Sequence, residues 1–198
     1  MKYYLDITLM PDPEITLGFI WQKVYQQVHI ALAENKIAES SSAIALAFPQ
    51  CSQNRDKNVA FPLGNKLRIF APSEELLDKL AINSWLKRFT DHTHITSIKT
   101  VPEKVNEFVC VKRKQCKTNL SRLARRRAKR KEETFEKALQ HYASFKDEQS
   151  KQPYINVTSL SKKEQFRLFV EQKKVNEAIE GEFTCYGLSK EQATVPWF

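Results

Sequence analysis

The sequence has no long apolar run, and this absence excludes helical membrane proteins. Its uninterrupted apolar stretches are only a few residues long, whereas a membrane-spanning helix needs about 20 residues. No apolar signal segment with a cleavage site stands at the amino terminus, where residues 3–9 already alternate like a strand. We therefore expect a protein that has no membrane partner and stays in the cytoplasm.

Cysteine is scarce, and the familiar metal and nucleophile motifs are missing. The four cysteines, Cys51, Cys110, Cys116 and Cys185, form no C-x-x-C pair and have no histidine at zinc-ligand spacing, so we expect reduced thiols. Neither D-x-D nor H-E-x-x-H occurs, and the G-x-S-x-G nucleophile pattern is also absent. The sequence therefore predicts no metal site and no other cofactor.

Positive charge, by contrast, is concentrated in one segment. The chain of 198 residues has 32 Lys and Arg against 23 Asp and Glu, a net charge of +9. Residues 112–131 hold eleven of the basic residues and no acidic one, so the remaining 21 basic residues are balanced by the 23 acidic ones. Such a segment indicates a polyanionic partner, and a nucleic acid is favoured over a membrane or an acidic protein.

The basic segment is expected to form a helix that begins at Thr118 or Asn119 and runs into the 140s, continuous or broken near residues 131 and 132. It keeps a narrow apolar stripe of Leu120, Leu123, Ala124 and Ala128. A merely solvated basic face would carry interspersed glutamates, which are missing here. Because the groove of A-form RNA opens beside loops and helix ends, an RNA hairpin is the expected target.

Hydrophobic periodicity predicts a βαββαβ order over the first hundred residues, the ferredoxin-like arrangement. The predicted elements are strands at residues 3–9, 43–48, 66–70 and 95–101, and helices at residues 16–35 and from Ser73 onward. Shorter strands are predicted at residues 108–111, 154–158 and 166–170. The expected fold class is α+β, with a ferredoxin-like domain over residues 1–104 and a smaller C-terminal domain over residues 105–198 that carries the basic linker and the arginine-rich helix.

One histidine is a candidate for proton transfer. His29 lies about 120° from the centre of the apolar face of its helix, at the boundary beside Tyr25, so a harmless boundary histidine remains an alternative. A nuclease without a metal can use the 2′-hydroxyl of the RNA as its nucleophile, and then needs only a base, a positioned 2′-oxygen and stabilisation of the phosphorane. By itself, the hydroxyl cluster of Thr158, Ser159 and Ser161 is unremarkable.

Several segments, which together span nearly the whole chain, point to one known family. They are residues 4–7 and 11–13, the helix around His29, and residues 165–169, 183–190 and 195–198. These segments resemble the type I-F CRISPR repeat-processing endoribonucleases. The resemblance implies metal-independent cleavage of precursor CRISPR RNA at the base of the repeat stem-loop, with a 2′,3′-cyclic phosphate and a 5′-hydroxyl as product ends.

The resemblance also implies roles for individual residues. His29 would deprotonate the 2′-hydroxyl or serve the leaving 5′-oxygen, Ser159 would hold the ribose, and Tyr186 would orient His29. Ser161 is the secondary candidate beside Ser159. A subunit that caps the hairpin without cutting it is the alternative, but binding alone needs none of these side chains.

The remaining implied residues bind RNA. Arg113 and Gln115 would read bases at the foot of the stem, and Phe166 would stack beneath the last base pair unless it is simply a core residue of a strand. The residues expected in the major groove are Arg122, Arg125, Arg126, Arg130 and Lys129, the last at a position where the family often has arginine. The implied partners are the repeat hairpin, which stays bound as crRNA, and the other subunits of the type I-F interference complex.

Overall fold

The computed structural model describes residues 1–52, 61–115, 120–143, 152–160 and 163–198. The chain divides into two compact units, one made of residues 1–114 and 152–198 and the other of residues 115–151. This division differs from the predicted boundary between residues 104 and 105. Strands that follow residue 105 belong to the first unit because their buried side chains, such as Val109 and Leu168, share one hydrophobic cluster with Leu5.

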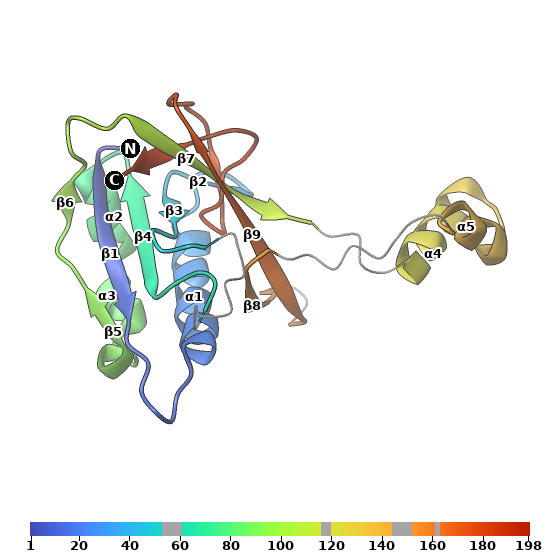
Figure 1. Cartoon of the computed structure of the whole chain (residues 1–198), viewed down its shortest axis with the longest axis horizontal. Helices are drawn as coiled ribbons and strands as arrows, with labels where there is room; N and C mark the ends of the chain where they lie inside the picture. The colour runs from blue at the N-terminus through green and yellow to red at the C-terminus, as the bar shows by residue number, and fades with distance from the viewer. Residues whose placement is uncertain (53–60, 116–119, 144–151, 161–162) are drawn as a thin grey trace. The chain divides into compact units, whose positions relative to one another are not determined.

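The first sheet is antiparallel and has the strand order β3-β4-β1-β5, with β6 also paired to β1 (Figure 1). Its strands are β1 (Tyr3–Leu9), β3 (Ala45–Ala47), β4 (Lys66–Ala71), β5 (Thr93–Ile95) and β6 (Lys99–Thr100). Alternation explains β1, since Leu5, Ile7 and Leu9 are buried on the core face.

The prediction of one continuous strand at residues 95–101 was wrong. The segment forms the two short strands β5 and β6, which pair with different parts of β1. Between them the backbone N–H of Asp6 donates to the side-chain oxygen of Thr96 at 3.0 Å, in place of a main-chain carbonyl. The ladder is therefore interrupted by a side chain, an effect that residue alternation cannot predict. The strand predicted at residues 43–48 is also shorter, limited to β3.

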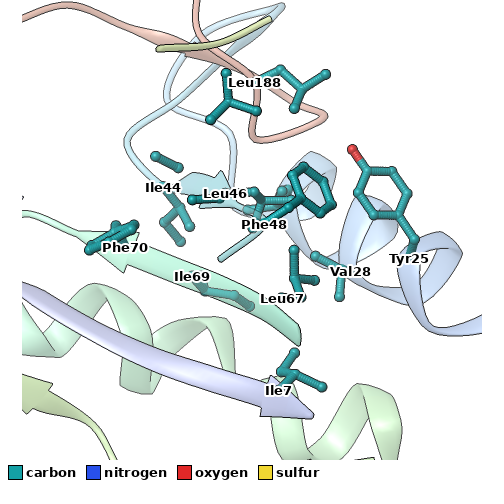
Figure 2. Packing of buried hydrophobic residues seen from close by; sticks show 14 of the residues in the cluster. Ile7, Tyr25, Val28, Ile44, Leu46, Phe48, Leu67, Ile69, Phe70 and Leu188 are labelled. Atoms are coloured by element: carbon teal, nitrogen blue, oxygen red, sulfur yellow. The ribbon is translucent and has the colours of Figure 1, made fainter. Parts of the chain in front are cut away.

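Three α-helices accompany this sheet: α1 (Leu17–Glu34), α2 (Glu74–Leu80) and α3 (Ile82–Leu86), followed by a 3₁₀ turn at Thr90–His92. The predicted apolar face of α1 is buried as expected, with Trp21, Val24 and Val28 fully enclosed. Figure 2 shows Val28 and Tyr25 of α1 beside Leu67 and Phe48 in this core. No described helix is apolar enough over sufficient length to cross a membrane.

A second antiparallel sheet has the order β11-β7-β9-β8, and β2 pairs separately with β10. The bounds are β2 (Ser41–Ser42), β7 (Glu107–Lys114), β8 (Tyr154–Thr158), β9 (Gln165–Val175), β10 (Phe183–Thr184) and β11 (Val195–Trp197). β8 matches its prediction. β7 and β9 are longer than predicted because they pair with each other, which makes residues 112–114 of the expected linker part of a strand.

In its described part, the second unit contains two helices, α4 (Leu120–Lys131) and α5 (Phe135–His141). Glu132 breaks the helical path with a left-handed φ of 53°, at the place where a break was considered. The hydroxyl of Thr134 then caps α5 by accepting from the backbone N–H of Lys137 at 3.3 Å. The predicted caps of the first helix, Thr118 and Asn119, lie outside the described residues.

Candidate active site

His29 is buried on α1 beneath a loop from the far end of the chain. Only 5% of its surface is exposed, so the prediction of a boundary position was wrong. The loop of residues 184–188 covers that flank of the helix, and the carbonyl of Cys185 lies 2.9 Å from His29 Nδ1. Because a carbonyl oxygen can only accept, Nδ1 carries the proton and donates it. The neutral ring therefore keeps an unprotonated Nε2, the atom a general base needs.

Tyr186 lies directly against this ring. The two ring centroids are 4.1 Å apart and the planes differ by 9°, a stacked arrangement. The backbone of Tyr186 is fixed by α1, since the hydroxyl of Tyr25 donates to the carbonyl of Tyr186 at 2.8 Å. In Figure 2 the Tyr25 hydroxyl points toward the loop that carries Leu188. Two side chains one helical turn apart, Tyr25 and His29, thus bind two consecutive carbonyls of the covering loop.

The loop keeps its shape through one glycine and one threonine. Gly187 has a left-handed φ of 70°, and an added Cβ would collide with the side chain of Leu46, so glycine is required. The carbonyl of Gly187 accepts from the N–H of Leu46 at 2.8 Å, which ties the loop to β3. The hydroxyl of Thr184 accepts from the N–H groups of Tyr186 and Leu188, both at 3.3 Å. The loop of residues 184–188, which covers His29, is therefore fixed to the first unit.

Burial sets the protonation state of the site. Desolvation lowers the pKa of His29 below its ordinary 6.5, and the hydrogen bond to Cys185 opposes this only in part. His29 is consequently neutral at pH 7 and can accept a proton. Burial likewise raises the pKa of Tyr186, against the lowering effect of the nearby Arg113 charge, so Tyr186 keeps its hydroxyl proton at neutral pH.

Ser159 begins the turn between β8 and β9. Its N–H donates to the carbonyl of Glu164 and its carbonyl accepts from Lys163, both at 2.9 Å. Its neighbour Thr158 is bonded to α1 through the side chain of Gln26, which accepts from the N–H of Thr158 at 2.8 Å and donates to its carbonyl at 3.2 Å. The turn that carries Ser159 is thus anchored to the helix that carries His29. Ser161 lies outside the described residues.

Phe166 and Arg113 extend the ring contacts outward. The Phe166 ring meets Tyr186 edge-on, with centroids 6.2 Å apart and planes at 85°. The guanidinium carbon of Arg113, an exposed residue of β7, lies 5.1 Å from the Phe166 centroid. The first unit therefore brings His29, Tyr186, Phe166 and Arg113 into one connected series. Gln115 is exposed and belongs to the other unit, so it is not part of this series.

Comparison with known proteins assigns the chain to a family. Residues 4–198 match the family model described as "CRISPR-associated protein (Cas_Csy4)". The chain belongs to the Csy4 family of CRISPR-associated proteins. Two curated relatives, both named "CRISPR-associated endonuclease Cas6/Csy4", are 33% identical (Escherichia coli strain UTI89 / UPEC) and 34% identical (Pseudomonas aeruginosa strain UCBPP-PA14), each over 100% of both chains. The family resemblance predicted from the sequence is confirmed.

Solved structures add only a weak likeness. One described as "An RAMP protein binding different RNA substrates" aligns with a TM-score of 0.33 and 13% identity, over 99% of both chains. Another, described as "Characterization of a Cas6-related gene from Pyrococcus furiosus", gives a TM-score of 0.34 and 13% identity over 99% of this chain and 98% of that one. At these values, the structural likeness is too weak to support a conclusion about this chain.

The basic residues of this Csy4-family chain differ in how they are engaged. On α4, Arg122, Arg125, Arg126, Lys129 and Arg130 are exposed. Arg127 is half-buried, and its Nε donates to the carboxylate of Glu133 at 2.6 Å. Arg127 therefore stabilises the junction with α5, whereas the side chains of the five predicted groove residues are exposed. Within the described parts of the chain, no cluster of three or more His, Cys, Asp and Glu side chains could hold a metal ion.

The sequence pattern missed two residues that contact the segments around the candidate site, Tyr25 and Gln26. Both lie on α1, four and three positions before His29, which is the spacing that brings helical side chains to one face. That spacing is a usable signal, but it becomes informative only once the partners are known. Those partners, Tyr186 and Thr158, lie more than a hundred residues away in the sequence.

Phe166→Ala separates stacking from packing at this site. If Phe166 stacks under a base pair, the variant should lose about 1–3 kcal/mol of hairpin affinity. A half-buried ring should cost less stability than the roughly 3–5 kcal/mol of a fully buried phenylalanine. Binding titration and thermal melting measure the two effects. Phe169→Ala is the matched control, since that ring contacts Tyr154 and should affect melting alone. Unchanged affinity with a large loss of melting temperature would make Phe166 a core residue.

Proposed function

We propose that this chain is a metal-independent endoribonuclease that cleaves precursor CRISPR RNA at the base of the repeat stem-loop. The observation that carries the proposal is the hydrogen bond from His29 Nδ1 to the Cys185 carbonyl. It leaves Nε2 as a base in a ring kept neutral by burial. Membership of the Csy4 family and the endonuclease names of the two relatives support the same conclusion.

The proposed reaction needs only groups of the protein and the RNA. His29 Nε2 takes the proton of the 2′-hydroxyl, and the 2′-oxygen attacks the adjacent phosphorus. The bond from phosphorus to the 5′-oxygen breaks, and that oxygen leaves as a 5′-hydroxyl with a proton returned by the His29 imidazolium, while the other product keeps a 2′,3′-cyclic phosphate. Ser159 holds the ribose for in-line attack, and the stacked ring of Tyr186 keeps the imidazole in its plane.

The proposed RNA contacts follow the exposed basic residues. Arg113 and Gln115 read bases at the foot of the stem, and Phe166 stacks beneath its last base pair. The exposed side chains of α4 bind the stem, which stays bound after cleavage in a complex with other subunits of the interference machinery. We place this activity in the cytoplasm, where the transcripts are made. The strand order of the first sheet supports the ferredoxin-like arrangement for this half of the protein.

A hairpin-binding subunit without activity is the competing function. Binding alone requires basic and aromatic surface, and α4 with Phe166 would suffice. It would not require a buried histidine whose tautomer is fixed by a main-chain carbonyl and whose ring is stacked under a tyrosine. That arrangement favours the enzyme.

The test uses an RNA with a hairpin-forming CRISPR repeat. A substrate with a single 2′-deoxy sugar before the scissile phosphate should bind like the natural RNA and remain uncut, because the nucleophile is gone. The natural RNA should be cut at the same rate in EDTA. Gel analysis of both RNAs, with end-group mapping of the products, measures the outcome. Cleavage of the deoxy substrate, or loss of cleavage in EDTA, would contradict the proposal.

A further inference from the structure

The side chain of Gln26 forms two hydrogen bonds with the backbone of a strand edge. Among the described strands, β8 is the outermost of its sheet, so its outer edge faces no described partner strand. At Thr158, the last residue of β8, the side-chain amide of Gln26 supplies both missing partners, an acceptor for the N–H at 2.8 Å and a donor for the carbonyl at 3.2 Å. An edge residue left without partners would have to be hydrated or unsatisfied. Gln26 thus acts as a one-residue substitute for a neighbouring strand.

The place of this contact connects it to the chemistry. Gln26 precedes His29 by three positions on α1, and Thr158 directly precedes Ser159. The backbone bonds of Ser159 to Glu164 and Lys163 hold it within its own turn. The Gln26 amide holds that turn to the catalytic helix. Tyr25, His29 and Gln26 together bind both segments that carry the other proposed catalytic side chains to one face of α1.

We propose that Gln26 is a positioning residue of the cleavage reaction, which fixes the backbone at Thr158 and thereby sets Ser159 at a working distance from His29. The inference rests on the proposed function. Gln26 contacts no reacting atom, so it acts on the rate through the geometry of the ribose and not through RNA affinity. Displacements of about 1 Å at a catalytic group can lower a rate about 100-fold.

The chain offers a matched control in a second glutamine clamp. Gln172, buried in β9, accepts from the N–H of Phe48 at 3.1 Å and donates to its carbonyl at 3.2 Å. This clamp has the same chemistry as that of Gln26, but its partner Phe48 is fully buried in the hydrophobic core, where its ring packs against Trp21. Loss of the Gln172 clamp should lower the melting temperature and leave the chemistry unchanged at temperatures where the variant is folded.

The experiment compares Gln26→Met, Gln26→Glu and Gln172→Met in the full chain, by single-turnover cleavage of the repeat RNA at saturating protein. Gln26→Met should cut about 10- to 100-fold more slowly than wild type, with unchanged hairpin affinity. Gln172→Met should cut at the wild-type rate. Gln26→Glu supplies a titratable version of the clamp, since only its protonated carboxyl can both donate and accept. Its rate relative to wild type should rise as pH falls from 7 towards its carboxyl pKa, ordinarily about 4.3.

The outcomes separate the inference from the function on which it rests. A wild-type rate in Gln26→Met overturns the inference alone. So does a ratio of Gln26→Glu to wild type that stays as flat with pH as that of Gln26→Met, because then no hydrogen bond of residue 26 governs the rate. Wild-type protein that binds the hairpin and never cuts it overturns the proposed function and the inference together.

Discussion

Replacing His29 with alanine should slow cleavage of the repeat hairpin by roughly 10²–10⁴ and leave hairpin affinity unchanged, the usual effect of removing one proton-transfer group. The imidazole is buried and its Nδ1 is engaged by Cys185, so its contribution to RNA binding should be small. Single-turnover cleavage and equilibrium binding, measured on the same preparation, give the two quantities.

His94→Ala is the matched control for this variant. His94 is an exposed residue of β5 and belongs to none of the contacts around His29, so its loss should change neither rate nor affinity. Thermal melting of His29→Ala is needed beside the kinetics, because the deleted ring leaves Tyr186 without its stacking partner. A folded His29→Ala protein that cuts at the wild-type rate would remove His29 from the reaction.

Hairpin affinity should fall by about 10²–10⁴ between 50 and 200 mM salt, if five to eight phosphates are neutralised at a slope near −0.7 to −0.9 per contact. Arg125→Ala and Arg126→Ala should each weaken binding and flatten the slope, since both side chains are exposed on α4. The measurement is a series of dissociation constants over a range of salt concentrations.

Arg127→Ala tests whether position matters more than total charge. Its guanidinium is already bound to Glu133, so its loss should change the salt slope less than that of Arg125 or Arg126, and should instead destabilise the junction of α4 with α5. Equal slope changes for all three variants would mean that binding responds only to net charge. Affinity independent of salt would rule out phosphate contacts by α4.

Hydrophobic alternation and periodicity correctly predicted the helices and strands whose bounds depend little on which element they pack against. The alternation in residues 3–9 gave β1 with its bounds, because any sheet that buries one face selects the same residues. The periodicity of residues 16–35 gave α1 to within one residue at each end, with Thr16 and Asn35 as its caps. β8 was found for the same reason. In each case the signal lies within the element itself.

What the sequence could not give depends on contacts between distant segments. The helical periodicity predicts His29 at the boundary of the apolar face of its helix, because the loop that buries it contains Cys185, which is 156 positions away. The interruption at Thr96 depends on a side chain that bonds to Asp6, 90 positions earlier. The family resemblance identified His29, Ser159 and Tyr186 as candidates. The hydrogen bonds of Tyr25 and Gln26 to distant backbone groups could be identified only in the structure. Their roles in cleavage, like those of the RNA-binding residues, stay predictions.

The tautomer of His29 depends on a main-chain atom, and this shapes how the sequence can vary. The acceptor at Cys185 is its carbonyl oxygen, so exchange of the free thiol side chain leaves that oxygen in place. Gly187, two residues later, has no such latitude, since any side chain there collides with Leu46. The side chain at position 185 can therefore vary without disturbing the proton on His29 Nδ1, whereas a change at position 187 is transmitted to His29 through the displaced backbone.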